Sequence, residues 1–148
     1  MNTAQDERVA SKSRSDQVRL TEIFLSLQGE STSVGLPTVF VRLTGCPLRC
    51  TYCDTEYAFH GGSSVGIAEV LAEVRGLDAR QVTVTGGEPL AQPGALPLLT
   101  ALCDQGYAVS LETSGALDVS AVDGRVRKVL DLKTPGSGEM HRNLWSNL

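Results

Sequence analysis

The chain has 148 residues, a formal net charge of −4 and 41% hydrophobic residues. This length fits one domain with a real core, and a charged fraction of 20% argues against wholesale disorder. The acidic balance gives no footprint for non-specific nucleic-acid binding, and no apolar run approaches the ~20 residues that a membrane span needs. The N-terminus also lacks the apolar core of a secretory signal, so we expect a cytoplasmic protein whose thiols stay reduced.

The N-terminal third of the chain predicts a flexible tail followed by two strands. Residues 1–18 are polar and mixed in charge, so we expect a tail there, ahead of a core domain over residues 19–148. Strands are predicted at residues 20–27 and 37–44, because β-branched and aromatic residues are frequent in both. A cysteine-rich loop begins directly after the second strand.

The rest of the chain alternates between helical and strand patterns. Apolar residues recur at helical spacing over residues 65–77 and 95–105, which predicts two helices. Short runs rich in β-branched residues predict strands at 81–85, 107–112 and 126–133. This alternation is typical of parallel βα units, so the predicted fold class is α/β.

Three of the four cysteines are clustered in the sequence. Cys46, Cys50 and Cys53 form a C-x3-C-x2-C pattern, which lets three sulfurs surround one metal centre. Cys103 lies in an apolar helical stretch and is predicted to be a core residue. Structural zinc needs four ligands, usually in two separated pairs, and the second pair is missing here. Three thiolates on a 4Fe–4S cluster would leave one iron open for exogenous chemistry.

Two other interpretations of this cluster stay open. His60 or His141 could complete a zinc site, although neither has finger-like spacing from a partner. A non-enzymatic metal-binding or electron-transfer module would need a fourth ligand and would have no cofactor site beside the cluster.

Five segments of the chain carry a resemblance to a known family. They are F-L-S-L-Q-G-E at 24–30, T-V-F-V-R-L-T-G-C at 38–46, C-D-T-E-Y-A-F at 53–59, T-V-T-G-G-E-P at 83–89 and E-T-S-G at 112–115. The cluster loop, with Tyr52 before its last cysteine, resembles that of the radical S-adenosylmethionine enzymes. Together and in this order, the five segments resemble the 7-carboxy-7-deazaguanine synthase family of queuosine precursor synthesis.

The resemblance implies a partial, open parallel βα barrel with a 4Fe–4S cluster at its mouth. In this family the open iron chelates S-adenosylmethionine, and the reduced cluster cleaves it to methionine and a 5′-deoxyadenosyl radical. The radical starts the ring contraction of the small-molecule substrate 6-carboxy-5,6,7,8-tetrahydropterin, and ammonia leaves. The resemblance also implies Mg²⁺, a homodimer, a flavodoxin-type electron donor and no direct contact with tRNA.

The family's metal-binding positions are matched in this chain. The resemblance implies that Cys46, Cys50 and Cys53 hold the cluster. It also implies that Thr55 helps to bind Mg²⁺, a hard cation that accepts hydroxyl oxygens together with water and substrate. The alternative for Thr55 is a loop hydroxyl that caps backbone groups.

The family's ligand-binding positions are matched as well. S-adenosylmethionine would lie against Gly87, with Ser114 and Lys133 as weaker candidates, although these residues can equally turn the chain or end a strand in solvent. Glu88 is either a turn residue or a support for the ammonium group of the cofactor. The substrate-binding positions implied are Leu27, Gln28, Gly29, Arg42 and Thr85. Arg42 can pair with the substrate carboxylate or form a surface ion pair.

The resemblance weakens at the C-terminal end. Members of the family usually run on for tens of residues, so we expect the last βα units to be missing and the chain to bind a cluster but turn over poorly. The alternatives are a radical enzyme similar to the glycyl-radical activases, or an inactive, truncated iron–sulfur protein.

Overall fold

The computed structural model describes residues 14–148, so most of the tail expected over residues 1–18 lies outside the described residues. Of the last residues of that segment, Gln17 and Val18 already belong to the first strand, and Val18 is buried. Among residues 14–148, no helix is long and apolar enough to cross a bilayer.

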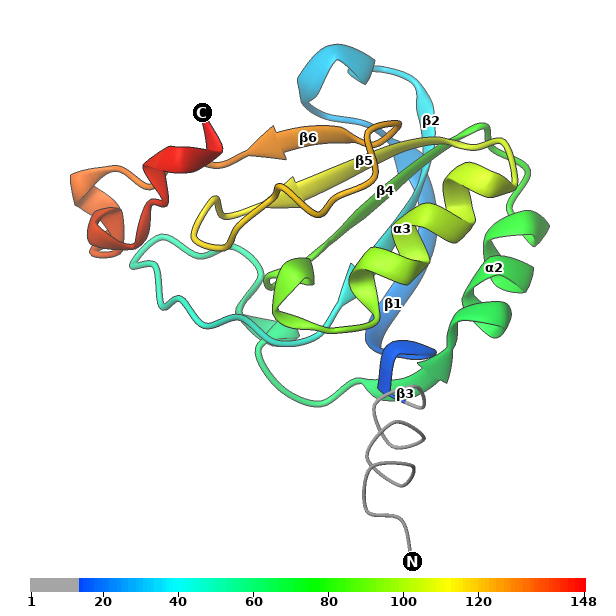
Figure 1. Cartoon of the computed structure of the whole chain (residues 1–148), viewed down its shortest axis with the longest axis horizontal. Coiled ribbons are helices and arrows are strands. Elements are labelled where there is room, and N and C mark those ends of the chain that lie inside the picture. Colours follow the sequence, from blue (N-terminus) through cyan, green and yellow to red (C-terminus); the bar gives the residue numbers. More distant parts are fainter. Residues whose placement is uncertain (1–13) are drawn as a thin grey trace, which may run out of the picture.

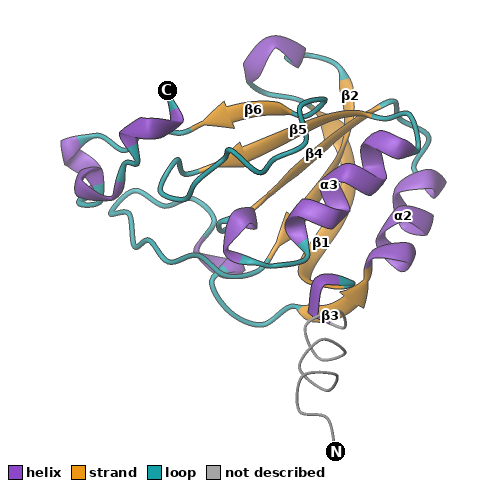
Figure 2. Cartoon of the chain, in the orientation of Figure 1, coloured by secondary structure: helices purple, strands orange, loops and turns teal. Residues whose placement is uncertain are grey.

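One six-stranded sheet and two helices form the described part of the chain (Figure 1, Figure 2). The strands are β1 (Gln17–Leu27), β2 (Pro37–Leu43), β3 (Ser63–Gly66), β4 (Gln81–Gly86), β5 (Ala108–Thr113) and β6 (Arg127–Leu130). The helices are α2 (Ile67–Gly76) and α3 (Ala95–Asp104), and both cover the same face of the sheet. The strand order is β3-β1-β2-β4-β5-β6.

The sheet is parallel only in part. Strands β2, β4, β5 and β6 run parallel, whereas β1 is antiparallel to both β2 and β3. The prediction of a parallel sheet is therefore wrong for the end of the sheet formed by β1 and β3. The connection between β1 and β2 is shorter than the roughly a dozen residues that a parallel crossover needs. It closes as a hairpin instead, in which the Gln28 backbone N–H donates to the Leu36 carbonyl at 3.0 Å.

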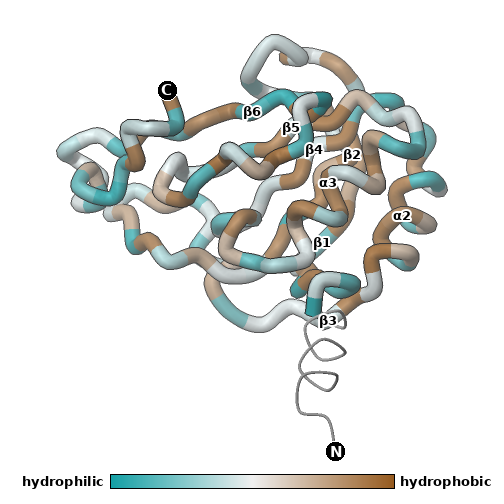
Figure 3. Tube along the Cα trace, viewed as in Figure 1, coloured by the Kyte–Doolittle hydropathy of each residue, from teal (hydrophilic) through white to brown (hydrophobic). Residues whose placement is uncertain are grey.

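The hydrophobic core lies between the sheet and its two helices. On β2, Val39, Val41 and Leu43 are fully buried against the helices, because successive side chains of a strand point to opposite faces. Burying each such side chain contributes about 1.5–3 kcal/mol. Figure 3 shows the hydrophobic stretches of the chain gathered where the helices meet the strands. Cys103 is buried in this core, as the sequence predicts.

The predicted α/β architecture and most element positions are confirmed, with four local differences. Helix α2 begins at Ile67 rather than at residue 65, because the preceding residues form β3, a strand that the sequence does not predict. Strand β1 begins three residues before the prediction. Strand β6 ends at Leu130 rather than at residue 133. After β6 the chain continues through short 3-10 turns towards the cysteine loop.

Candidate active site

A cavity of about 640 Å³ opens at the carboxyl ends of the parallel strands, where α/β folds usually bind ligands. The loops after β2, β4, β5 and β6 all contribute to it, because parallel strands deliver their carboxyl ends to one side of the sheet (Figure 1). The predicted site residues that line it are Cys46, Cys50, Cys53, Thr55, Arg42, Thr85, Gly87, Ser114 and Lys133.

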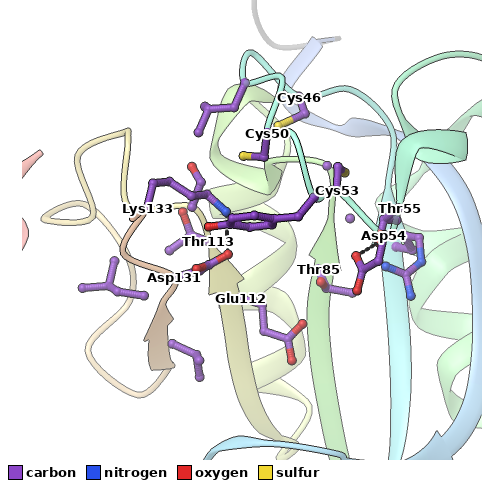
Figure 4. A pocket seen from close by; sticks show the side chains of 18 of the residues that line it. Cys46, Cys50, Cys53, Asp54, Thr55, Thr85, Glu112, Thr113, Asp131 and Lys133 are labelled. Carbon is purple, nitrogen blue, oxygen red and sulfur yellow. Dashed lines mark hydrogen bonds and ion pairs between the residues drawn. The ribbon is translucent and has the colours of Figure 1, made fainter. Parts of the chain in front are cut away.

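The cysteine loop spans the mouth of this cavity (Figure 4). Its start is fixed by the Gly45 N–H, which donates to the Ala58 carbonyl at 2.7 Å. Arg49 holds the middle of the loop, because one of its Nη groups donates to the Cys46 carbonyl at 2.7 Å. The Thr51 N–H donates to the Ser137 carbonyl at 3.0 Å, so the C-terminal segment braces the loop from outside.

The three thiols are half-buried and unpaired. Burial is the main cause that raises the pKa of Cys46, and the nearby Glu88 raises it further, so the thiol resists ionisation until a cation replaces its proton. Within the described residues, no three His, Cys, Asp or Glu side chains surround a point suited to one metal ion. A 4Fe–4S cluster makes a different demand, since each thiolate binds its own iron. Three accessible thiols on one loop meet that demand.

Gly86 and Gly87 bring the end of β4 against the start of the cysteine loop. A Cβ added to Gly87 would lie 2.2 Å from the Gly45 carbonyl oxygen and 2.9 Å from the Cβ of Cys46, so no side chain fits. Gly86 has a φ of 145°, and a Cβ there would meet the Leu43 backbone. These two glycines therefore let the end of β4 pack directly against the start of the cysteine loop, and both also line the cavity.

Glu88 joins the ends of β4 and β5. Its side chain is fully buried, and its carboxylate accepts hydrogen bonds from the Thr113 hydroxyl at 2.8 Å and from the Ser114 N–H at 2.7 Å. It also accepts from the Ser114 hydroxyl at 2.5 Å and from the Leu90 N–H at 3.0 Å. The carboxylate thus fixes Ser114 in place, and Glu88 is absent from the side chains that line the cavity.

The wall that carries Thr55 is strongly acidic. The Thr55 hydroxyl donates to Asp54 at 2.8 Å. The charge of Glu112 is the largest cause that raises the pKa of Glu30, followed by burial and by the charges of Asp131 and Asp54. Figure 4 shows Glu112 between Asp54 on one side of the cavity and Asp131 on the other. Such concentrated negative charge is a suitable setting for a hard divalent cation.

Arg42 and Thr85 lie on neighbouring strands, in register with each other. Both side chains line the cavity. Arg42 Nε donates to Glu22 Oε1 at 2.8 Å, and only 16% of the arginine side chain is exposed. Arg42 therefore forms an ion pair with Glu22, and this pair is partly buried at the cavity wall rather than exposed on an outer surface.

Lys133 is held from two sides. The two polar atoms of the Asn143 side chain bond the Lys133 backbone N–H and carbonyl, each at 2.9 Å. Its Nζ donates to Asp131 at 2.5 Å, and 10% of the side chain is exposed. Burial opposes the charged amine, but the hydrogen bond and charge of Asp131 outweigh it and raise the pKa of Lys133. The alternative of a solvated strand end is wrong, because the lysine points into the cavity.

Three predicted residues lie outside the cavity lining. The Leu27 side chain is 64% exposed, and Gly29 has open space around it. Gln28 is buried, and its Nε2 donates to Thr83 at 3.1 Å and to Glu112 at 3.3 Å. Gln28 thus reaches the cavity through Glu112, which lines it.

Several side chains that shape the cavity are not among the predicted site residues. Asp131 and Asn143 each come from a loop and carry no local pattern. Glu30 ends the quoted F-L-S-L-Q-G-E segment, but nothing in that segment indicates that it lies close to Glu112 and Asp131. Glu112 lies inside the quoted E-T-S-G segment and directly follows the buried Leu111 on β5. Because successive side chains of a strand point to opposite faces, this position indicates that Glu112 faces the cavity side of the sheet.

Comparisons with known proteins agree on one group. The model of the radical SAM superfamily matches residues 40–135. The 7-carboxy-7-deazaguanine synthase of Chlorobaculum tepidum is 49% identical over 130 residues, which cover 88% of this chain and 59% of that protein. The protein of the same name from Koribacter versatilis is 48% identical over 124 residues, which cover 82% of this chain and 55% of that protein.

A solved structure shares the fold. The crystal structure of QueE from Escherichia coli matches with a TM-score of 0.73 and 29% identity, over 86% of this chain and 65% of that one. The chain thus spans less than two thirds of the length of these relatives.

Proposed function

Since the chain belongs to the radical SAM superfamily, we propose that it acts as a 7-carboxy-7-deazaguanine synthase. The reaction would convert 6-carboxy-5,6,7,8-tetrahydropterin to 7-carboxy-7-deazaguanine with loss of ammonia, which makes the enzyme a carbon–nitrogen lyase of queuosine biosynthesis. The observation that supports this proposal most strongly is that all but three of the predicted site residues line one cavity.

In this proposal Cys46, Cys50 and Cys53 hold a 4Fe–4S cluster at the cavity mouth. When bound, the reduced cluster supplies the electron that cleaves S-adenosylmethionine. The backbone of Gly87 would contact that cofactor, because Gly87 lines the cavity and is packed directly against Gly45 and Cys46 at the start of the cysteine loop. Ser114, fixed by Glu88, and Lys133, fixed by Asn143, would hold the polar groups of the cofactor.

The other wall would receive the pterin. Arg42 would bind its carboxylate through charge-assisted hydrogen bonds, with Thr85 beside the ring and Thr55 contributing to a Mg²⁺ site. Gln28 would support the substrate site from behind the cavity wall, because its side chain donates to Glu112, and the adjacent backbone of Leu27 and Gly29 would hold Gln28 there. The half-enclosed cavity limits the access of water to the reacting atoms. We also propose a homodimer, a flavodoxin-type electron donor and a cytoplasmic location.

Anaerobic reconstitution with iron and sulfide tests the proposal. We expect about four irons per chain, formation of 5′-deoxyadenosine when a reductant and S-adenosylmethionine are added, and 7-carboxy-7-deazaguanine only when the carboxy-pterin and Mg²⁺ are also present. A Cys50→Ala variant is the matched control and should lose the cluster and both products. Bound zinc without cleavage of the cofactor would contradict the proposal, and so would cleavage without pterin product.

A further inference from the structure

The guanidinium of Arg42 is held on three sides by residues that the proposed function does not use. Glu22 Oε1 on β1 accepts a hydrogen bond from Arg42 Nε at 2.8 Å. The same oxygen accepts a hydrogen bond from the Tyr57 hydroxyl, also at 2.8 Å. The rings of Phe24 and Tyr57 each lie 5.7 Å from the Cζ of Arg42, within the range of cation–π contacts. Phe24 is itself stacked on Phe40 with ring centroids 5.1 Å apart.

These contacts leave the Nη edge of the Arg42 guanidinium for a ligand. An arginine can meet a carboxylate with Nε and one Nη, or end-on with its two Nη groups. Glu22 occupies Nε, and within residues 14–148 Arg42 makes no other hydrogen bond. The Nη groups therefore remain for the cavity, which Arg42 lines and which Glu22 and Tyr57 do not.

Tyr57 also connects Arg42 to the cysteine loop. Tyr57 belongs to the short turn Glu56–Ala58 that follows the last cluster cysteine. Ala58, the next residue, is fully buried and accepts the hydrogen bond from Gly45 that starts the loop. The position of Tyr57 is thus fixed by the same backbone that positions Cys46.

We propose that Glu22 and Tyr57 are positioning residues that hold Arg42 for end-on binding of a carboxylate, and that they make the site selective for a carboxylated pterin. This inference rests on the proposed function. A simple surface ion pair would not need the second donor on Glu22 Oε1, nor the two aromatic rings beside the guanidinium.

Binding measurements test this role without depending on turnover. The dissociation constants of 6-carboxy-5,6,7,8-tetrahydropterin and of tetrahydropterin, which lacks the carboxylate, are measured by calorimetry on cluster-loaded protein with S-adenosylmethionine and Mg²⁺. We expect Glu22→Gln and Tyr57→Phe each to weaken binding of the carboxylated pterin about tenfold and to leave tetrahydropterin binding unchanged. Glu73→Gln, on the exposed face of α2, and Tyr107→Phe, beside the core, are the matched controls.

The outcomes separate the two proposals. If the parent protein does not prefer the carboxylated pterin, the proposed function itself fails. If the parent prefers it and both variants keep that preference, or weaken both pterins equally, the positioning role is overturned while the proposed function stands. Tyr57→Phe removes one hydroxyl from an exposed side chain, so this variant is expected to fold even if Glu22→Gln does not.

Discussion

Alternate residues of the same strands build two unlike faces of the sheet. Towards the helices, β2 and β4 present Val41 and Val84, which are fully buried in an apolar core. Towards the cavity, the next residues along, Arg42 and Thr85, present charge and a hydroxyl. The difference shows that one set of backbone hydrogen bonds supports two tasks, since the helix side supplies the free energy of folding and the cavity side holds polar groups that reduce it.

The largest effect on stability should come from the helix face. Leu102→Ala removes a fully buried side chain from the core-facing side of α3 and leaves a cavity. We expect the free energy of unfolding of the metal-free protein to fall by about 2–5 kcal/mol in urea denaturation. The control on the other face is Thr85→Ala, which should cost about 1 kcal/mol or less. Equal losses from the two variants would remove the distinction between the faces.

A second change tests the buried carboxylate of Glu88, which joins the ends of β4 and β5. Glu88→Gln replaces an oxygen that accepts two hydrogen bonds from Ser114 by an amide nitrogen, which can only donate. We expect a loss of about 2 kcal/mol in the free energy of unfolding, measured as before. The same substitution at the exposed Glu73 should change it by less than about 0.5 kcal/mol. If both substitutions are neutral, the carboxylate does not hold Ser114 in solution.

The smallest effect should be a gain in stability at the cavity face. Neighbouring carboxylates raise the pKa of Glu30 in the folded protein, so its contribution to stability is complete below the ordinary glutamate pKa and is lost as the pH rises through the raised value. Glu30→Gln removes this loss. In thermal unfolding with a chelator present, the variant should therefore be more stable than the parent at neutral pH and equal to it in acid. A constant difference across the pH range would show that the repulsion is absent.

The sequence predicts the parts of the fold in which local pattern and tertiary structure agree. Strand β4 and helix α3 begin at the residues predicted and end within one residue of the prediction, because a clear period is bounded by glycine or proline. Strand β3 was missed since S-S-V-G has little strand character of its own, and it is extended only through pairing with the first residues of β1. Strand β6 ends early because Leu130 pairs with Thr113, the last residue of β5, so the chain beyond it has no strand to pair with there.

The candidate site divides in a similar way. The cysteines, Gly87 and Arg42 lie in contiguous motifs and could be found from the sequence alone. The contact of Arg42 with Glu22 and Tyr57 could not be found, although Tyr57 lies in the C-D-T-E-Y-A-F segment, because it arises only through the antiparallel pairing of β1 with β2 and the return of the cysteine loop. Contacts between residues so far apart in the chain leave no periodic signal.

Within the described part of the chain, both margins of the sheet are strands of only four residues, β3 and β6. An unpaired margin is a template on which another molecule can add a strand and begin a fibril. Here the template is too brief to hold many such bonds, and β6 opens with the exposed cations Arg127 and Lys128, which repel a second copy. In residues 14–148 the two margins of the sheet are therefore protected against strand addition by their short length and, at β6, by positive charge.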